Sequence, residues 1–170
     1  MSSTGDKLTV AALFAERESR RRHDREADEQ LQQKRDEELA QFRQRLENFQ
    51  LTDDIIKAGM DRIRRAFERG ETELMISAFP SAFCTDNGRS IINAGAPPIN
   101  KPTRQELATR GDEPEWLATM PAGVRKVFDF WKADLKDGGF KISVRIINFP
   151  DGKPGDVGLF ISWPKDSMEA

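Results

Sequence analysis

The chain has 170 residues, with 27 basic and 29 acidic side chains, one histidine, one cysteine and a mean hydropathy of -0.66. No stretch approaches the roughly 20 apolar residues that a membrane-spanning helix needs, so we expect no membrane partner. One cysteine excludes an internal disulfide, and with one histidine it excludes the usual zinc sites, so we expect no metal and no cofactor. The first residues lack the basic start and apolar run of a secretory signal, which predicts a cytoplasmic location.

Proline and glycine divide the chain into two regions. All nine prolines lie at Pro80 or later, and the first 50 residues contain only Gly5 as glycine. We therefore predict an α+β protein with a long helical stem at 1–50 and a small domain at 51–170. The stem is a charged, coiled-coil-like α-helix, and the domain contains amphipathic helices packed on a mainly antiparallel sheet with a C-terminal β-hairpin.

The predicted stem helix runs from about Leu8 to Gln50, with Asp6 as its cap, because strong helix formers fill this stretch. A helix of that length measures on the order of 60 Å. Its middle, Ala15–Gln30, has no apolar side chain larger than alanine. Opposite charges stand four residues apart there, as in Glu18 and Arg22, which indicates a solvated rod.

Apolar residues gather at both ends of the stem. One group repeats at spacings of three and four residues, which forms a seam of about two heptads, and the other lies at the start of the helix. We predict that the protein oligomerises or docks through these residues: Val10, Leu13, Phe14, Leu39, Phe42, Leu46 and Phe49. In the competing geometry the stem folds back against Ile56 to Phe67, and the protein could then be monomeric.

The small domain begins with a predicted helix near 53–69, capped by Thr52 or Asp53 and ended by Gly70. Its apolar face comprises Ile56, Met60, Ile63 and Phe67, and a stripe of basic residues, Arg62, Arg65 and Arg69, is expected on the opposite, solvated face. Alternating apolar residues then predict a strand near 72–79, which Pro80 ends.

The stretch from Pro80 to Met120 is rich in proline and glycine, so we expect mostly loop, with a short helix near Thr103–Thr109 and a strand at Ser90–Asn93. Cys84, near Asp86 and Arg89, is the one candidate nucleophile. It lacks a base, because the only histidine, His23, lies in the stem. A buried hydrophobic role is the simpler interpretation, and we predict that the protein is not an enzyme.

Two further signals complete the domain. A helix is predicted near 121–137, with Pro121 as its first residue and a buried face of Val124, Val127, Phe128, Trp131 and Leu135. Period-two alternation then predicts strands near 140–149 and 157–163, joined by a turn at Pro150–Gly155.

These patterns favour a non-enzymatic interaction or assembly protein whose partner is itself or another protein. The order of the elements is also that of a winged-helix DNA-binding domain, which predicts an alternative, a nucleic-acid-binding regulator dimerised by the stem. Its contacts would be Arg125, Lys126, Lys132 and Lys136 on the helix and Lys153 on the wing. Residues 51–170 carry 17 basic and 18 acidic side chains, so nucleic acid is the less favoured partner.

Overall fold

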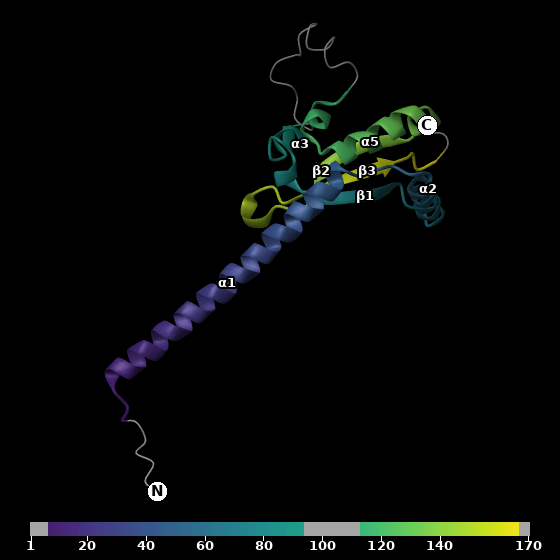
Figure 1. Ribbon diagram of the computed structural model, residues 1–170. Helices are drawn as coiled ribbons and strands as arrows, with labels where there is room; N and C mark the ends of the chain where they lie inside the picture. Colours follow the sequence, from purple (N-terminus) through teal and green to yellow (C-terminus); the bar gives the residue numbers. More distant parts are fainter. Residues whose placement is uncertain (1–6, 94–112, 167–170) are drawn as a thin grey trace, which may run out of the picture. The chain divides into compact units, whose positions relative to one another are not determined.

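The computed structural model describes residues 7–93 and 113–166 (Figure 1). It confirms the predicted α+β fold, with a long N-terminal helix and an antiparallel sheet that includes a C-terminal hairpin. Contacts within the chain divide it into two units, Met1–Gln44 and Arg45–Ala170. The second unit, called the compact unit below, therefore includes the last turn of the long helix and the link that follows it.

The long helix, α1, spans Val10–Glu47, which is 38 residues, and it has no buried residue. It starts after Thr9, whose side chain accepts a hydrogen bond from the backbone N of Ala12 at 3.0 Å. The predicted cap, Asp6, lies outside the described residues. Along the charged middle, Arg25 and Glu18 pair at 3.4 Å on the exposed surface. The helix is therefore held by its own backbone and by local side-chain pairs, as a solvated rod requires.

The sheet of the compact unit has three strands in the order β1-β3-β2, and both pairings are antiparallel. The strands are β1 (Glu73–Pro80), β2 (Lys141–Ile146) and β3 (Asp156–Ser162). Residues 157–161 of the central strand, β3, are buried. The strands β1 and β2 flank β3 on its two edges. The turn between β2 and β3 places Asp151 and Gly152 at φ values of 52° and 77°, as its aspartate and glycine predict.

Two helices of the compact unit follow the predicted periodicity. The first, α2, spans Asp53–Glu68, and the side chain of Thr52 accepts a hydrogen bond from the backbone N of Ile55. The second, α5, spans Ala122–Phe130 and continues through a π-helical turn, Trp131–Leu135, and a short 3-10 turn to Gly138. Pro121 is the cap of α5 and not its first residue.

The predicted strand at Ser90–Asn93 is wrong, because Arg89–Asn93 form a short helix, α3. The carboxylate of Asp86 accepts hydrogen bonds from the backbone N–H groups of Gly88 and Ser90, at 3.0 and 2.8 Å. An aspartate just ahead of a helix is a local start signal, so the sequence contained the information. The predicted helix at Thr103–Thr109 lies outside the described residues.

The closed part of the core lies where α3, α5 and a 3-10 turn, Glu115–Thr119, meet the sheet. Its buried side chains come from segments far apart in the sequence and include Phe79, Phe83, Cys84, Ile91, Trp116, Leu117, Met120, Phe128 and Val157. Trp116 and Phe128 meet edge to face, with ring centroids 6.0 Å apart. The 3-10 turn was not predicted, yet it supplies two of these side chains. This half of the domain is therefore fully packed.

Candidate functional site

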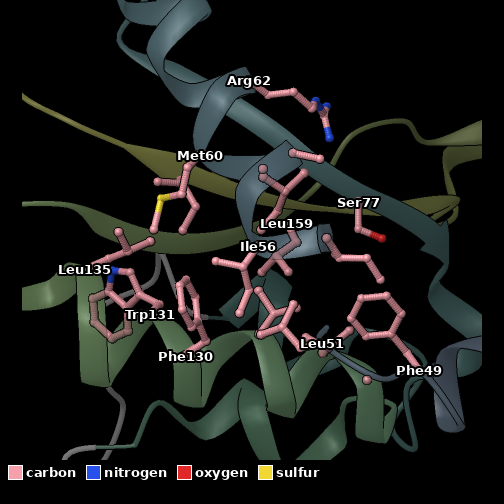
Figure 2. A pocket seen from close by; sticks show the side chains of 18 of the residues that line it. Phe49, Leu51, Ile56, Met60, Arg62, Ser77, Phe130, Trp131, Leu135 and Leu159 are labelled. Atoms are coloured by element: carbon pink, nitrogen blue, oxygen red, sulfur yellow. The ribbon is translucent and has the colours of Figure 1, made fainter. Parts of the chain in front are cut away.

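An apolar groove lies on the other half of the sheet, between α2 and α5. It encloses a cavity of about 320 Å³. Figure 2 shows its lining, which comes from both helices, the sheet and the link after α1. The residues that line it are mostly large and apolar, among them Phe49, Leu51, Ile56, Met60, Ile63, Ile76, Val127, Phe130, Trp131, Leu159 and Ile161.

The groove is open because α2 does not close on the sheet. Only Ala66 of α2 is buried, whereas Ile56, Met60 and Ile63 are half-buried and Phe67 is 61% exposed. The predicted apolar face with Ile56, Met60, Ile63 and Phe67 is therefore present, but it is only partly buried. The face points into a groove that the described residues leave unfilled.

The end of α1 and the link after it contact the start of α5. The side chain of Glu47 accepts a hydrogen bond from the backbone N of Ala122 at 3.2 Å, and Lys126 donates to the carbonyl oxygen of Phe49 at 2.7 Å. A Cβ on Gly123 would overlap the carbonyl oxygen of Leu46. This close approach fixes the first turn of α5 against the link, and Leu46 and Phe49 become one end of the groove.

A second cavity, of about 440 Å³, extends the groove. It shares Met60, Ile63 and Leu135 with the first, and its other apolar lining residues include Phe67 and Trp163. The apolar surface therefore continues along α2, whose 16 residues measure about 24 Å. We call the two cavities together the α2 groove.

Among the described residues, Arg62 is the only charged side chain that lines the first cavity. Its Nη2 donates a hydrogen bond to the carbonyl oxygen of Met75 at 3.2 Å, which holds the guanidinium at the edge of β1 (Figure 2). The expectation that Arg62 lies opposite the apolar face is therefore wrong. Arg65 donates a hydrogen bond to the carbonyl oxygen of Asp61, and Arg69 donates hydrogen bonds to the carboxylate of Glu71.

The residues predicted for oligomerisation fall into two groups. Val10, Leu13, Phe14 and Leu39 are exposed on α1, and Phe42 is half-exposed. Leu46 and Phe49 belong to the compact unit and line the groove. Sequence periodicity alone missed this division. It also missed Leu8, which is exposed and lies two residues before the start of α1.

Four of the five residues predicted for nucleic-acid contact are exposed, namely Arg125, Lys132, Lys136 and Lys153, and Lys126 is half-buried. Lys126 is held by the carbonyl of Phe49, and the Nζ of Lys136 lies 5.9 Å from the ring centroid of Trp131.

Cys84 is a buried thiol, 2% exposed, with its Sγ 4.0 Å from the Sδ of Met120. Burial raises the pKa of this thiol to about 11, and the nearby charge of Asp86 acts in the same direction. At neutral pH the group is therefore a thiol, whereas a nucleophile needs the thiolate. The carboxylate of Asp86, which lies close to Cys84 in the sequence, accepts hydrogen bonds from the backbone at the start of α3.

Within residues 7–93 and 113–166, no cluster of three or more potential metal-ligating side chains is present. None of the helices in these two ranges has the length and apolar content to cross a membrane. The remaining candidate site is the α2 groove, which has the chemistry of a binding surface, since it is concave and mostly apolar. Its charged lining residues are Arg62 in the first cavity and Arg64, Lys165 and Asp166 in the second. No family model, curated protein or solved structure matches the chain.

Proposed function

We propose that this protein is a non-enzymatic interaction or assembly protein that associates through α1, in the first place with a second copy of itself. The observation that supports this function is the surface of α1, which has 38 residues and none buried. Large apolar side chains are exposed at its start, where Leu8, Val10, Leu13 and Phe14 lie within seven residues. Together we call these four residues the start cluster.

The free energy available from covering the start cluster is substantial. Burial of one large apolar side chain contributes about 1.5–3 kcal/mol, so several such residues would offset part of the cost of association. A contiguous exposed apolar patch of this kind is typical of an interaction surface. The compact unit adds a second uncovered apolar surface, the α2 groove. The cytoplasmic location stays a prediction.

Nucleic-acid binding is the second candidate function, and the exposed cations Arg125, Lys132 and Lys153 favour it. Titration of duplex DNA at several salt concentrations tests it, because phosphate contacts make the affinity fall steeply as salt rises. Absence of binding at low salt would exclude this candidate.

The mass of the protein in solution tests the first candidate. Light scattering after size exclusion, over a wide concentration range, is expected to give a multiple of the 19.3 kDa chain mass. A chain beginning at Arg45 keeps Leu46 and Phe49 in the compact unit, and it is expected to be monomeric. Circular dichroism of the shortened chain provides the folding control. A full-length chain that remains monomeric at every concentration contradicts self-association.

A further inference from the structure

We propose that the α2 groove is the receptor for the start cluster of a second copy of this chain. This inference rests on the proposed self-association through α1 and specifies the surface that receives it. A short amphipathic helix would lie in a groove between two helices, which is a recurrent mode of recognition. The contact is heterologous, because a helix start on one chain meets a groove on another.

The chemistry of the start cluster matches that of the groove. Val10, Leu13 and Phe14 stand at positions i, i+3 and i+4, so their side chains share one face of α1. Glu18 follows Phe14 by four residues and lies one turn further along that face. The segment therefore presents an apolar face followed by an acid. The first cavity presents an apolar lining with one cation, Arg62.

Glu18 can exchange its ion-pair partner at little cost in free energy. In the single chain Glu18 pairs with Arg25 at 3.4 Å, with both side chains more than half exposed. Exposed ion pairs of this kind contribute only about 0–1 kcal/mol. If Glu18 paired with Arg62 of the neighbouring chain, the loss of its ion pair with Arg25 would therefore cost little free energy. The new ion pair at the groove edge would be better shielded from water.

The dimensions also agree. A cavity of about 150 Å³ is known to take a benzene-sized group, so the first cavity, at about 320 Å³, has room for about two such groups. Leu13 and Phe14 are the two largest apolar side chains of α1's first turns. The segment from Leu8 to Glu18 measures about 16 Å as a helix, within the roughly 24 Å length of α2.

The continuity of α1 favours a second copy over the same chain as the source of the segment. Leu46 lines the groove, and Phe14 stands 32 residues earlier in the same unbroken helix. Each chain thus carries one groove and one start cluster, which generates either a reciprocal pair or a ring or open chain of copies.

Complementation between two full-length variants tests this contact. Leu13→Glu with Phe14→Glu charges the start cluster and leaves the groove intact. Ile63→Glu charges the groove and leaves the start cluster intact. Each variant alone is expected to be monomeric by light scattering. An equimolar mixture is expected to form a heterodimer of twice the chain mass and nothing larger, because it retains only one functional pair of surfaces.

Three further variants and one control extend the test. Gly59→Gln also obstructs the groove, and it replaces Ile63→Glu if that variant misfolds, because a Cβ on Gly59 meets no atom within 4 Å. Arg62→Glu is expected to weaken association several-fold, and Glu18→Arg is expected to restore it in a mixture of the two variants. Leu31→Glu changes an exposed residue of α1 outside the start cluster and is expected to leave the mass unchanged.

Several outcomes would overturn the inference. Groove variants that keep the wild-type mass, while the start-cluster variant loses it, would show that α1 associates elsewhere; self-association would then stand without this receptor. A mixture of the start-cluster variant and the groove variant that fails to form the heterodimer would also show that α1 associates elsewhere. A wild-type chain that is monomeric at all concentrations would refute the proposed self-association itself. A monomer that carries an acyl-chain amphiphile in native mass spectrometry, displaced by Gly59→Gln, would assign the groove to a small ligand instead.

Discussion

Gly123 is the residue at which the end of α1 meets the start of α5. A Cβ at this position would overlap the carbonyl oxygen of Leu46 and approach the Cβ of Phe49 to 2.8 Å. Backbone atoms cannot rotate away as a flexible side chain does, so the absence of a side chain is what permits the contact. One end of the groove therefore depends on a glycine inside a helix, where glycine by itself is unfavourable.

We expect Gly123→Ala to lower the free energy of unfolding by about 1–3 kcal/mol, because the added methyl group overpacks this contact. Gly59→Ala is the matched control, since it lies in α2 with no atom within 4 Å of the new Cβ. Its expected effect has the opposite sign, a gain of about 0.5–1 kcal/mol from helix propensity. Urea denaturation followed by tryptophan fluorescence measures both. Equal effects from the two substitutions would contradict the assigned contact.

Arg145 and Glu73 form an ion pair on the face of the sheet opposite the groove. Two hydrogen bonds join them, and the Arg145 guanidinium lies 3.6 Å from the ring centroid of Phe160. The hydrogen bond from Arg145 lowers the pKa of Glu73 below its ordinary value. The pair connects the two outer strands over the central one, and it shields Phe160, which is buried.

A lowered carboxyl pKa determines the sign of the pH effect. The stabilisation from Glu73 is present above the ordinary glutamate range and is lost as the pH falls through the lowered pKa. Both side chains are about half exposed, so we expect no more than about 1 kcal/mol. Urea midpoints of wild type and Glu73→Gln should differ near neutral pH and converge in acid. A pH-independent difference for Glu73→Gln would count against the pair.

At the scale of elements, α2 is the helix whose role changed most between expectation and structure. Its cap and its apolar face are local properties, and both are present. The tertiary structure decides what this face contacts. Leu46 and Phe49 lie beside the start of α5. Ala66 is the only buried residue of α2, and Arg62 connects the helix to the carbonyl oxygen of Met75 in β1.

The cap of α2 contributes to the stability of this helix. Thr52→Ala removes the acceptor for the backbone N of Ile55, and we expect it to lower the free energy of unfolding by about 1 kcal/mol. Thr52→Ser keeps the hydroxyl and is expected to stay close to wild type. Urea midpoints distinguish the two variants. Indistinguishable midpoints for alanine and serine would show that the hydroxyl does not hold this helix.

At the scale of the whole molecule, two apolar surfaces remain uncovered among the described residues, the start cluster on α1 and the α2 groove. They belong to different units of the chain. Burial of one against the other in an assembly would stabilise the folded state by mass action, because the unfolded chain has neither surface.

Thermal stability should therefore depend on protein concentration. Above the dissociation constant, a 100-fold rise in concentration adds about 2.7 kcal/mol to the native state, which corresponds to several degrees in the unfolding midpoint. Differential scanning calorimetry over this range measures the shift. The Leu13→Glu, Phe14→Glu variant is expected to unfold at a constant temperature. If wild type behaves in the same way, no assembly forms under these conditions.

The sequence by itself determined the elements whose causes are local. Helix caps, apolar periodicity and glycine stops indicated α1, α2 and α5, and strand alternation with turn residues indicated the hairpin of β2 and β3. The start cluster is also visible in the sequence, because nothing within the surrounding helix covers it. The error at Ser90–Asn93 arose from overlooking the Asp86 cap, which is a local signal too.

Only the tertiary structure decided which surfaces meet. The seam residues Leu46 and Phe49 pack beside α5, although their spacing equally fits an intermolecular coiled coil. Arg62 turns toward the groove because the carbonyl of Met75 lies within its reach. The α2 groove itself combines segments from Leu46 to Ile161, and no local pattern connects them. Periodicity specifies that a face is apolar, but the partner of that face depends on the packing of the whole chain.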